Sequence, residues 1–183
     1  MRVILSPQCA LGVALLLCLD PGGLVLPLLA AVFFHESGHL LALAICRVPV
    51  QEIRFGFFGA SIRTGVRGQR QELFCAAAGP AANGVICALS FGKSAPVFAV
   101  NLWLAISNLL PLYLLDGGRA LFALLPAHAP QIQTVILVFL LLLSGYAAAV
   151  WHLGLPCALF CLGILFRMLQ GKKNCKMEGS VLQ

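Results

Sequence analysis

Two histidines four residues apart are the first residues in this chain that could do chemistry. Residues 34–39 read Phe-His-Glu-Ser-Gly-His and contain the pattern His35-Glu36-x-x-His39. On a helix, residues four apart share a face, so both imidazoles can reach one metal ion. Zinc accepts imidazole nitrogens, and the intervening glutamate can act as a general base toward a water molecule. The alternative is a polar cluster that holds helices together, but ionisable groups within an apolar run are costly and are usually functional.

Asp116 is the best candidate for a third ligand. A tetrahedral zinc with one open position needs three protein ligands, and the two histidines supply only two. Asp116 alone among the remaining acidic residues lies within an apolar segment; the others are Asp20, Glu52, Glu72 and Glu178. At helical rise, His39 and Asp116 are expected at similar depths in their segments. The alternative is that Asp116 pairs with Arg119 and that Gly117-Gly118 is only a hinge.

The composition requires lipid as the solvent for most of the chain. Of 183 residues, 61% are hydrophobic and only 10% are charged, and the mean hydropathy is +0.98. A soluble domain is about one quarter charged. The net charge of +6 comes from basic residues in a few hydrophilic islands, so we expect no nucleic-acid partner. The eight cysteines form no CxxC pair and are interpreted as small helix-packing residues rather than as a disulfide framework.

Apolar runs predict an all-α polytopic membrane protein of about six spans. The run at 95–125 is too long for one simple helix and contains Pro111, so we expect two helical pieces joined by a bend. Residues 1–171 are expected to form the membrane domain and residues 172–183 a basic cytoplasmic tail. The six predicted spans cover about 3–19, 24–46, 73–91, 95–125, 131–153 and 155–170.

The polar island at 47–72 carries five arginines and sets the expected orientation. With six crossings and a cytoplasmic N-terminus, every Lys and Arg except Lys93 falls on the cytoplasmic side, together with both termini. Within the island, residues 53–57 alternate in polarity as a strand does. A turn at Gly59-Ala60 or Gly65 could lead to a partner strand near 60–66. The alternative is a solvated arginine-rich loop.

Three blocks of sequence resemble the site-2 protease family of intramembrane zinc metalloproteases. The resemblance implies that His35, His39 and Asp116 bind Zn²⁺ and that Glu36 activates water. It further implies that Asn108 positions the substrate or polarises its carbonyl, and that Asn83 contacts substrate. The strand-like stretch with Phe55 and Phe57 would be part of a membrane-associated β-hairpin or sheet that holds an extended substrate. The matching blocks are His35–His39, Ala78–Asn83 and Asn108–Arg119.

The size of the chain resembles the sporulation-type branch, whose members process a membrane-associated pro-sigma factor. The expected partners are therefore the lipid bilayer, a membrane-associated protein substrate such as a pro-sigma or anti-sigma factor, and a regulatory membrane protein. The expected location is a bacterial cytoplasmic or forespore membrane. The family usually has a second proline where this chain has Leu114, so a less rigid bend is expected. Neither a PDZ-like insertion nor a nucleotide-sensing C-terminal domain is expected.

Three other functions are compatible with some of these features. A catalytically inert protein could keep the metal site, but it would not need Glu36. A metal transporter would need polar groups along a path through the membrane, whereas here they converge at one depth. Hydrolysis of a non-peptide bond is compatible with the motif but not with the three-block resemblance. His128 and His152 have no partner at ligand spacing and are interpreted as interfacial residues.

Overall fold

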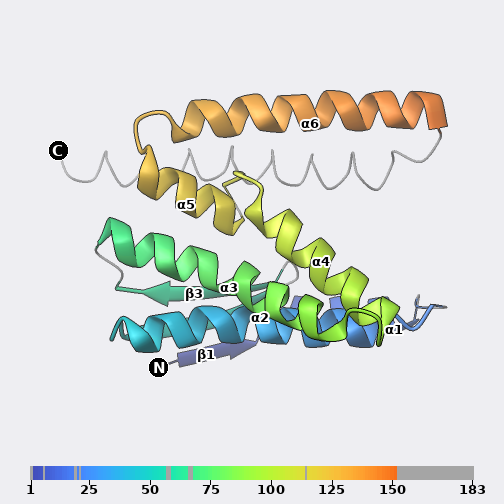
Figure 1. Ribbon diagram of the computed structural model, residues 1–183, viewed down its shortest axis with the longest axis horizontal. Helices are drawn as coiled ribbons and strands as arrows, with labels where there is room; N and C mark the ends of the chain where they lie inside the picture. The colour runs from blue at the N-terminus through green and yellow to red at the C-terminus, as the bar shows by residue number, and fades with distance from the viewer. Residues whose placement is uncertain are drawn as a thin grey trace.

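The computed structural model describes residues 2–5, 7–18, 20, 22–56, 59–65, 68–113 and 115–151. Within that part, the chain forms helices and one small sheet (Figure 1). The sheet and α2 lie at one side of the molecule, α6 lies at the other, and α4 and α5 lie between them. The elements are β1 Arg2–Leu5, α1 Pro7–Cys18, α2 Val25–Ile45, β2 Val50–Gly56, β3 Gly59–Thr64, α3 Gln69–Ser90, α4 Ala95–Leu109, α5 Asp116–Leu124 and α6 Ala129–Trp151.

Helices α2 and α3 pack closely because small residues line their contact. A Cβ added at Gly38 would lie 2.6 Å from the carbonyl oxygen of Ala78 and 2.9 Å from the Cβ of Ala82. No residue larger than glycine fits there without moving α3. Small residues at such an interface let helix backbones approach, as is common in membrane bundles. This close approach brings the histidines of α2 against α3.

The predicted bend in the run at 95–125 is present, and its residues explain it. Leu110 is extended (φ −60°, ψ 134°), as the steric demand of the following Pro111 favours, and α4 ends at Leu109. The chain then folds back over the first turn of α5. A Cβ at Gly117 would overlap the carbonyl of Leu109, and one at Gly118 would overlap that of Leu112. The two glycines therefore allow the connection to close tightly over the helix that begins with Asp116.

Helix α6 holds this bend from the other side. Leu112 and Leu137 are each 1% exposed and pack in one cluster. The buried Gln133 donates a hydrogen bond of 3.1 Å from Nε2 to the carbonyl oxygen of Gly118. The start of α5 is thereby fixed by packing and by a hydrogen bond from α6.

The sheet has the order β1-β2-β3, and it corrects two predictions. The hairpin is present, with β2 and β3 antiparallel, but Gly56 pairs with Gly59, so the turn precedes the predicted positions Gly59-Ala60 and Gly65. The helix predicted over about 3–19 is present but starts later: residues 2–5 form β1, parallel to β2, and the helix covers Pro7–Cys18. β-Branched Val3 and Ile4 favour a strand once a partner exists, and Pro7 suits a first helical position.

Two of the described helices, α2 and α3, are long and apolar enough to cross a membrane. Only 33% of the apolar window of each is buried, so both present much apolar surface outward. Helix α1, with 12 residues, reaches about 18 Å and is shorter than a hydrocarbon core of about 30 Å. The first predicted span, and the orientation that depends on six crossings, therefore stay predictions. Six spans remain a prediction, and the sixth, with the tail at 172–183, lies outside the described residues.

The start of α2 is capped by Asp20. Its Oδ1 accepts from the backbone N–H of Leu24 and its Oδ2 from that of Val25, both at 2.9 Å. These are N–H groups that a helix leaves without a partner at its first turn. The hydrogen bond from Val25, followed by that from Leu24, lowers the pKa of Asp20 below its usual value.

We expect D20N to lower the thermal midpoint of the detergent-solubilised protein at pH 7. Because the pKa of Asp20 is lower in the folded state, its contribution is complete above the unfolded pKa of about 3.9. That contribution disappears as the pH falls through the folded pKa. The difference in midpoint between wild type and D20N should therefore shrink on acidification. A difference that stays constant between pH 7 and pH 3 would contradict the cap.

Candidate metal centre

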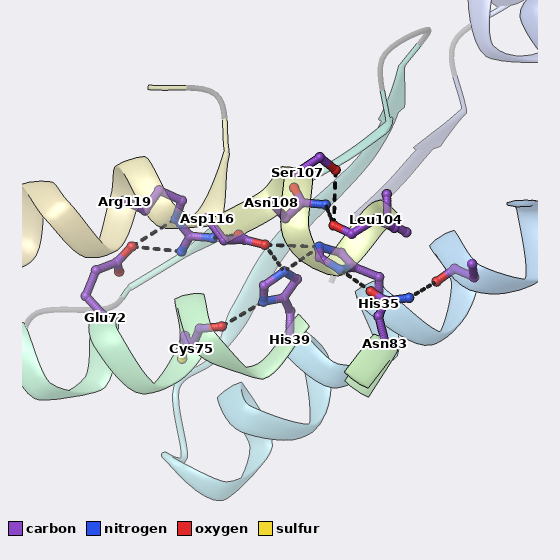
Figure 2. A network of polar contacts seen from close by, with 11 residues as sticks. His35, His39, Glu72, Cys75, Asn83, Leu104, Ser107, Asn108, Asp116 and Arg119 are labelled. Atoms are coloured by element: carbon purple, nitrogen blue, oxygen red, sulfur yellow. Dashed lines mark hydrogen bonds and ion pairs between the residues drawn. The ribbon is translucent and has the colours of Figure 1, made fainter. Parts of the chain in front are cut away.

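The structure brings His35, His39 and Asp116 to one point (Figure 2). Nε2 of His35 lies 3.0 Å from Oδ2 of Asp116, and Nε2 of His39 lies 3.1 Å from the same oxygen. The two Nε2 atoms are 3.2 Å apart. All three side chains are buried. Residues 77 positions apart in sequence thus present three possible ligand atoms to one small space.

The hydrogen bonds behind the rings determine which nitrogens face that space. Nδ1 of His39 lies 2.7 Å from the backbone carbonyl oxygen of Cys75, which can only accept. Nδ1 of His35 lies 2.6 Å from Oδ1 of Asn83. The Asn83 amide orientation is fixed, because its Nδ2 donates to the carbonyl oxygen of Ala31. Both histidines therefore carry their proton on Nδ1, and in the neutral ring each Nε2 presents a lone pair.

The three converging atoms fit a zinc site. Two imidazole lone pairs and a carboxylate oxygen at 3.0–3.2 Å repel one another unless positive charge lies among them. A proton on one Nε2 can point at only one of its two neighbours, whereas a metal ion contacts all three atoms. Ligand atoms about 2.0–2.1 Å from a tetrahedral zinc lie about 3.3 Å from one another. The observed triangle is close to that size, and the donor set matches zinc chemistry.

The second oxygen of Asp116 faces a basic residue. Nη1 of Arg119 lies 3.5 Å from Oδ1 of Asp116. Glu72 of α3 holds the same guanidinium, because its Oε1 accepts from Nε at 2.9 Å and from Nη2 at 2.8 Å. The two interpretations of Asp116 from sequence are therefore compatible: Oδ2 faces the histidines while Oδ1 faces Arg119.

Glu36 lies on α2 with the two histidines, whereas Asn108 lies on α4, the helix that precedes the bend before Asp116. Glu36 is partly exposed on α2, between the two histidines in sequence. Asn108 is partly buried near the end of α4, and its Nδ2 donates to the carbonyl oxygen of Leu104 at 2.9 Å (Figure 2). In this conformation one of the two N–H groups of its amide is used within its own helix.

The residues expected to bind substrate are placed differently from expectation. Asn83 is 0% exposed, and its amide bonds to protein groups on both sides; it lies behind His35 and offers no surface to a substrate. The backbone of Phe55 is paired on both sides, with Leu5 of β1 and Ala60 of β3. Its strand is the middle of the sheet, and the edges are β1 and β3. Phe57 lies outside the described residues.

Sequence reasoning missed three features of this site. Gly79 is needed because a Cβ there would lie 2.8 Å from Cε1 of His35 and would overlap Nε2 of His39. Asn101, 1% exposed, accepts from Asn83 through its Oδ1 at 2.9 Å. The third feature is the backbone carbonyl of Cys75, which accepts a hydrogen bond from His39. Because this contact involves the main chain, no pattern of side chains predicts it. Asn101 was detectable from sequence, because it is an amide inside an apolar run.

Comparison with known proteins supports the fold. No protein-family model matches the sequence, and no curated protein matches it either. Among solved structures, the chain is similar to the Site-2 Protease from Methanocaldococcus jannaschii, with a TM-score of 0.66 and 21% sequence identity. The similarity covers 90% of this chain and 87% of that one. The chain has the fold of a site-2 protease. The resemblance found in three short blocks thus extends over most of the structure.

Replacing Gly79 by Ala should disrupt the metal centre without unfolding the bundle. The added methyl group would displace the imidazoles, and we expect a loss of metal affinity of about tenfold or more. The matched control is G84A on the same helix, where a Cβ meets nothing within 4 Å and should stabilise the helix by roughly 0.5–1 kcal/mol. Competition with a chromophoric chelator measures the zinc affinity of both variants. Equal zinc affinity in G79A and G84A would contradict the placement of the histidines against Gly79.

Proposed function

We propose that this protein is an intramembrane zinc metalloprotease that hydrolyses a peptide bond in a membrane-associated protein. One observation carries the proposal: two histidines from α2 and an aspartate from α5 present three possible ligand atoms within 3.2 Å of one another. The His35-Glu36-x-x-His39 motif places a carboxylate beside that point. The fold shared with a site-2 protease supports the same class of reaction.

The roles of the residues follow from their chemistry. His35, His39 and Asp116 would hold the ion, which when bound polarises a scissile carbonyl and lowers the pKa of a water molecule. Glu36 takes the proton from the attacking water and returns it to the departing amine. Asn108 supplies the second N–H of its amide to the substrate backbone or to the developing oxyanion.

The sheet is the proposed holding site for the substrate chain. A peptide bond within a helix is shielded by its own hydrogen bonds, so a helical substrate must become extended before attack. An extended segment can add to a sheet edge through main-chain hydrogen bonds. Since Phe55 lies on the middle strand, its backbone cannot accept the substrate, and β1 or β3 would provide the edge. Phe55 and Phe57 are left as proposed side-chain contacts.

The setting proposed for this reaction is a bacterial cytoplasmic or forespore membrane. A multi-pass arrangement with cytoplasmic termini would place Arg119, Glu72 and the arginines of the 47–72 island on the side that water enters. A pro-sigma or anti-sigma factor is the proposed substrate, and a second membrane protein the proposed regulator. Apolar side chains exposed on α2 and α3, among them Leu26, Phe33, Leu41, Val85 and Leu89, support contact with lipid.

The central test separates metal binding from proteolysis. E36Q should retain about one zinc per chain, because Glu36 is no ligand, yet lose cleavage by about 10²–10⁴-fold. H35A and D116A should lose both zinc and cleavage. Zinc is measured by elemental analysis of the detergent-purified protein, and cleavage by mass spectrometry on a panel of single-span membrane peptides.

Each outcome of that test distinguishes one function from the others. The control is S37A, which removes only a hydroxyl bonded to the Phe33 carbonyl next to Glu36 and should keep both properties. Undiminished cleavage by E36Q would overturn the proposed mechanism. Zinc binding with no cleavage by wild type would favour an inert metal protein, and zinc flux in proteoliposomes would favour a transporter.

A further inference from the structure

A chain of two buried amides leads away from the metal centre behind His35. Asn83 is 0% exposed and Asn101 is 1% exposed. Oδ1 of Asn83 meets Nδ1 of His35 at 2.6 Å, and Nδ2 of Asn83 donates to Oδ1 of Asn101 at 2.9 Å. Asn101 in turn donates from Nδ2 to the carbonyl oxygen of Val97 at 2.8 Å. Each amide is therefore oriented by the next, and the chain ends on a backbone acceptor.

Asn83 holds the helix turn of His35 as well as the ring. Its Nδ2 also donates to the carbonyl oxygen of Ala31 at 3.0 Å. Ala31 precedes His35 by four residues on α2, which places it one helical turn away. The amide thus contacts both the imidazole and the backbone beneath it, so the ring cannot rotate without breaking a buried hydrogen bond. Breaking such a bond without replacement carries the desolvation cost of the exposed groups.

The two histidines differ in how their protons are fixed. His39 donates to the backbone carbonyl of Cys75, an acceptor that no side-chain substitution removes. His35 relies on a side chain from a different helix. An Asn amide can present either an oxygen or an NH₂ group, and an NH₂ facing Nδ1 would force the proton of His35 onto Nε2. The donation from Asn83 to Ala31 and Asn101 excludes that orientation.

We propose that Asn83, oriented by Asn101, is a positioning residue that fixes His35 with its proton on Nδ1 and thereby sets the metal affinity of the site. Partners of this kind orient metal-bound histidines and raise their basicity, and their loss typically lowers metal affinity by 10–100-fold. The inference rests on the proposed function only for the presence of a metal. It does not require that the protein cleaves peptides.

The competing explanation is that Asn83 only holds α2, α3 and α4 together. Three substitutions separate the two. N83L keeps approximately the volume but removes the acceptor for His35. N83D keeps an acceptor oxygen for His35 but places a carboxyl group against the oxygens of Ala31 and Asn101, which destabilises the fold. N101L leaves the Oδ1 atom of Asn83 in place for His35 but removes the Asn101 oxygen that orients the Asn83 amide.

The two explanations predict different orders of zinc affinity among the variants. If Asn83 is structural, zinc affinity should follow thermal stability across the variants. If Asn83 positions His35, zinc affinity should depend on whether residue 83 offers an acceptor oxygen to Nδ1 of His35. N83D should then bind zinc at least as tightly as wild type despite its lower stability. N83L should bind about 10–100-fold more weakly, and N101L should lie between wild type and N83L. The matched control is S90A, which removes a different buried polar group of α3, the Ser90 hydroxyl, and should leave zinc affinity unchanged.

The experiment combines affinity with a spectroscopic readout. Zinc affinity is measured in detergent by competition with a chromophoric chelator, and thermal midpoints of the metal-free variants are measured alongside. Cobalt(II) replaces zinc in parallel, because its visible absorption reports the number and kind of ligands. N83L should change that spectrum, whereas S90A should not.

Specific outcomes overturn the proposal. A folded N83L with wild-type zinc affinity and an unchanged cobalt spectrum would do so. Should N83L fail to fold, N83D decides alone, since a loss of zinc affinity of about tenfold in that variant would show that an acceptor for His35 is not what matters. Tight zinc binding without proteolysis in wild type would leave this inference intact and contradict only the proposed function.

Discussion

Mutual repulsion among three lone-pair-bearing atoms is the constraint on which this structure depends. Nε2 of His35, Nε2 of His39 and Oδ2 of Asp116 lie 3.0–3.2 Å apart in a buried space. Such an arrangement persists only if positive charge occupies it and if each group is held from behind. The Asn83 amide holds His35, the backbone carbonyl of Cys75 holds His39, and the guanidinium of Arg119 holds Asp116. The site is therefore shaped by the atoms behind its ligands as much as by the ligands.

Holding three groups from behind requires tight helix contacts, and small residues provide them. Gly38 lets α2 approach α3, and Gly79 leaves room for both imidazoles. On the opposite side, Gly117 and Gly118 let the connection from α4 close over the first turn of α5, while Gln133 of α6 binds the carbonyl of Gly118. These contacts together fix the position of Asp116 relative to the two histidines.

Local patterns predicted the three residues that converge and the bend, whereas long-range pairing was not accessible from sequence. His35, His39 and Asp116 were found because charge within an apolar run is costly, and Pro111 revealed the interruption that separates α4 from α5. Strand β1 was missed because residues 2–5 become a strand only by pairing with β2, some fifty residues later. Asn83 was assigned to substrate because a motif gives the residue type but not the direction in which its side chain points.

Exposure around the centre differs sharply between its two sides. Behind His35, Asn83 and Asn101 are at most 1% exposed, and no side chain of that amide pair has surface to offer. Beside Asp116, the side chains of Arg119 and Glu72 are 41% and 27% exposed. Water reaches the ligands with the smaller desolvation cost along the second side, since charged groups there already retain solvent. The dry side fixes the histidines, and the polar side carries the charged groups that retain contact with solvent.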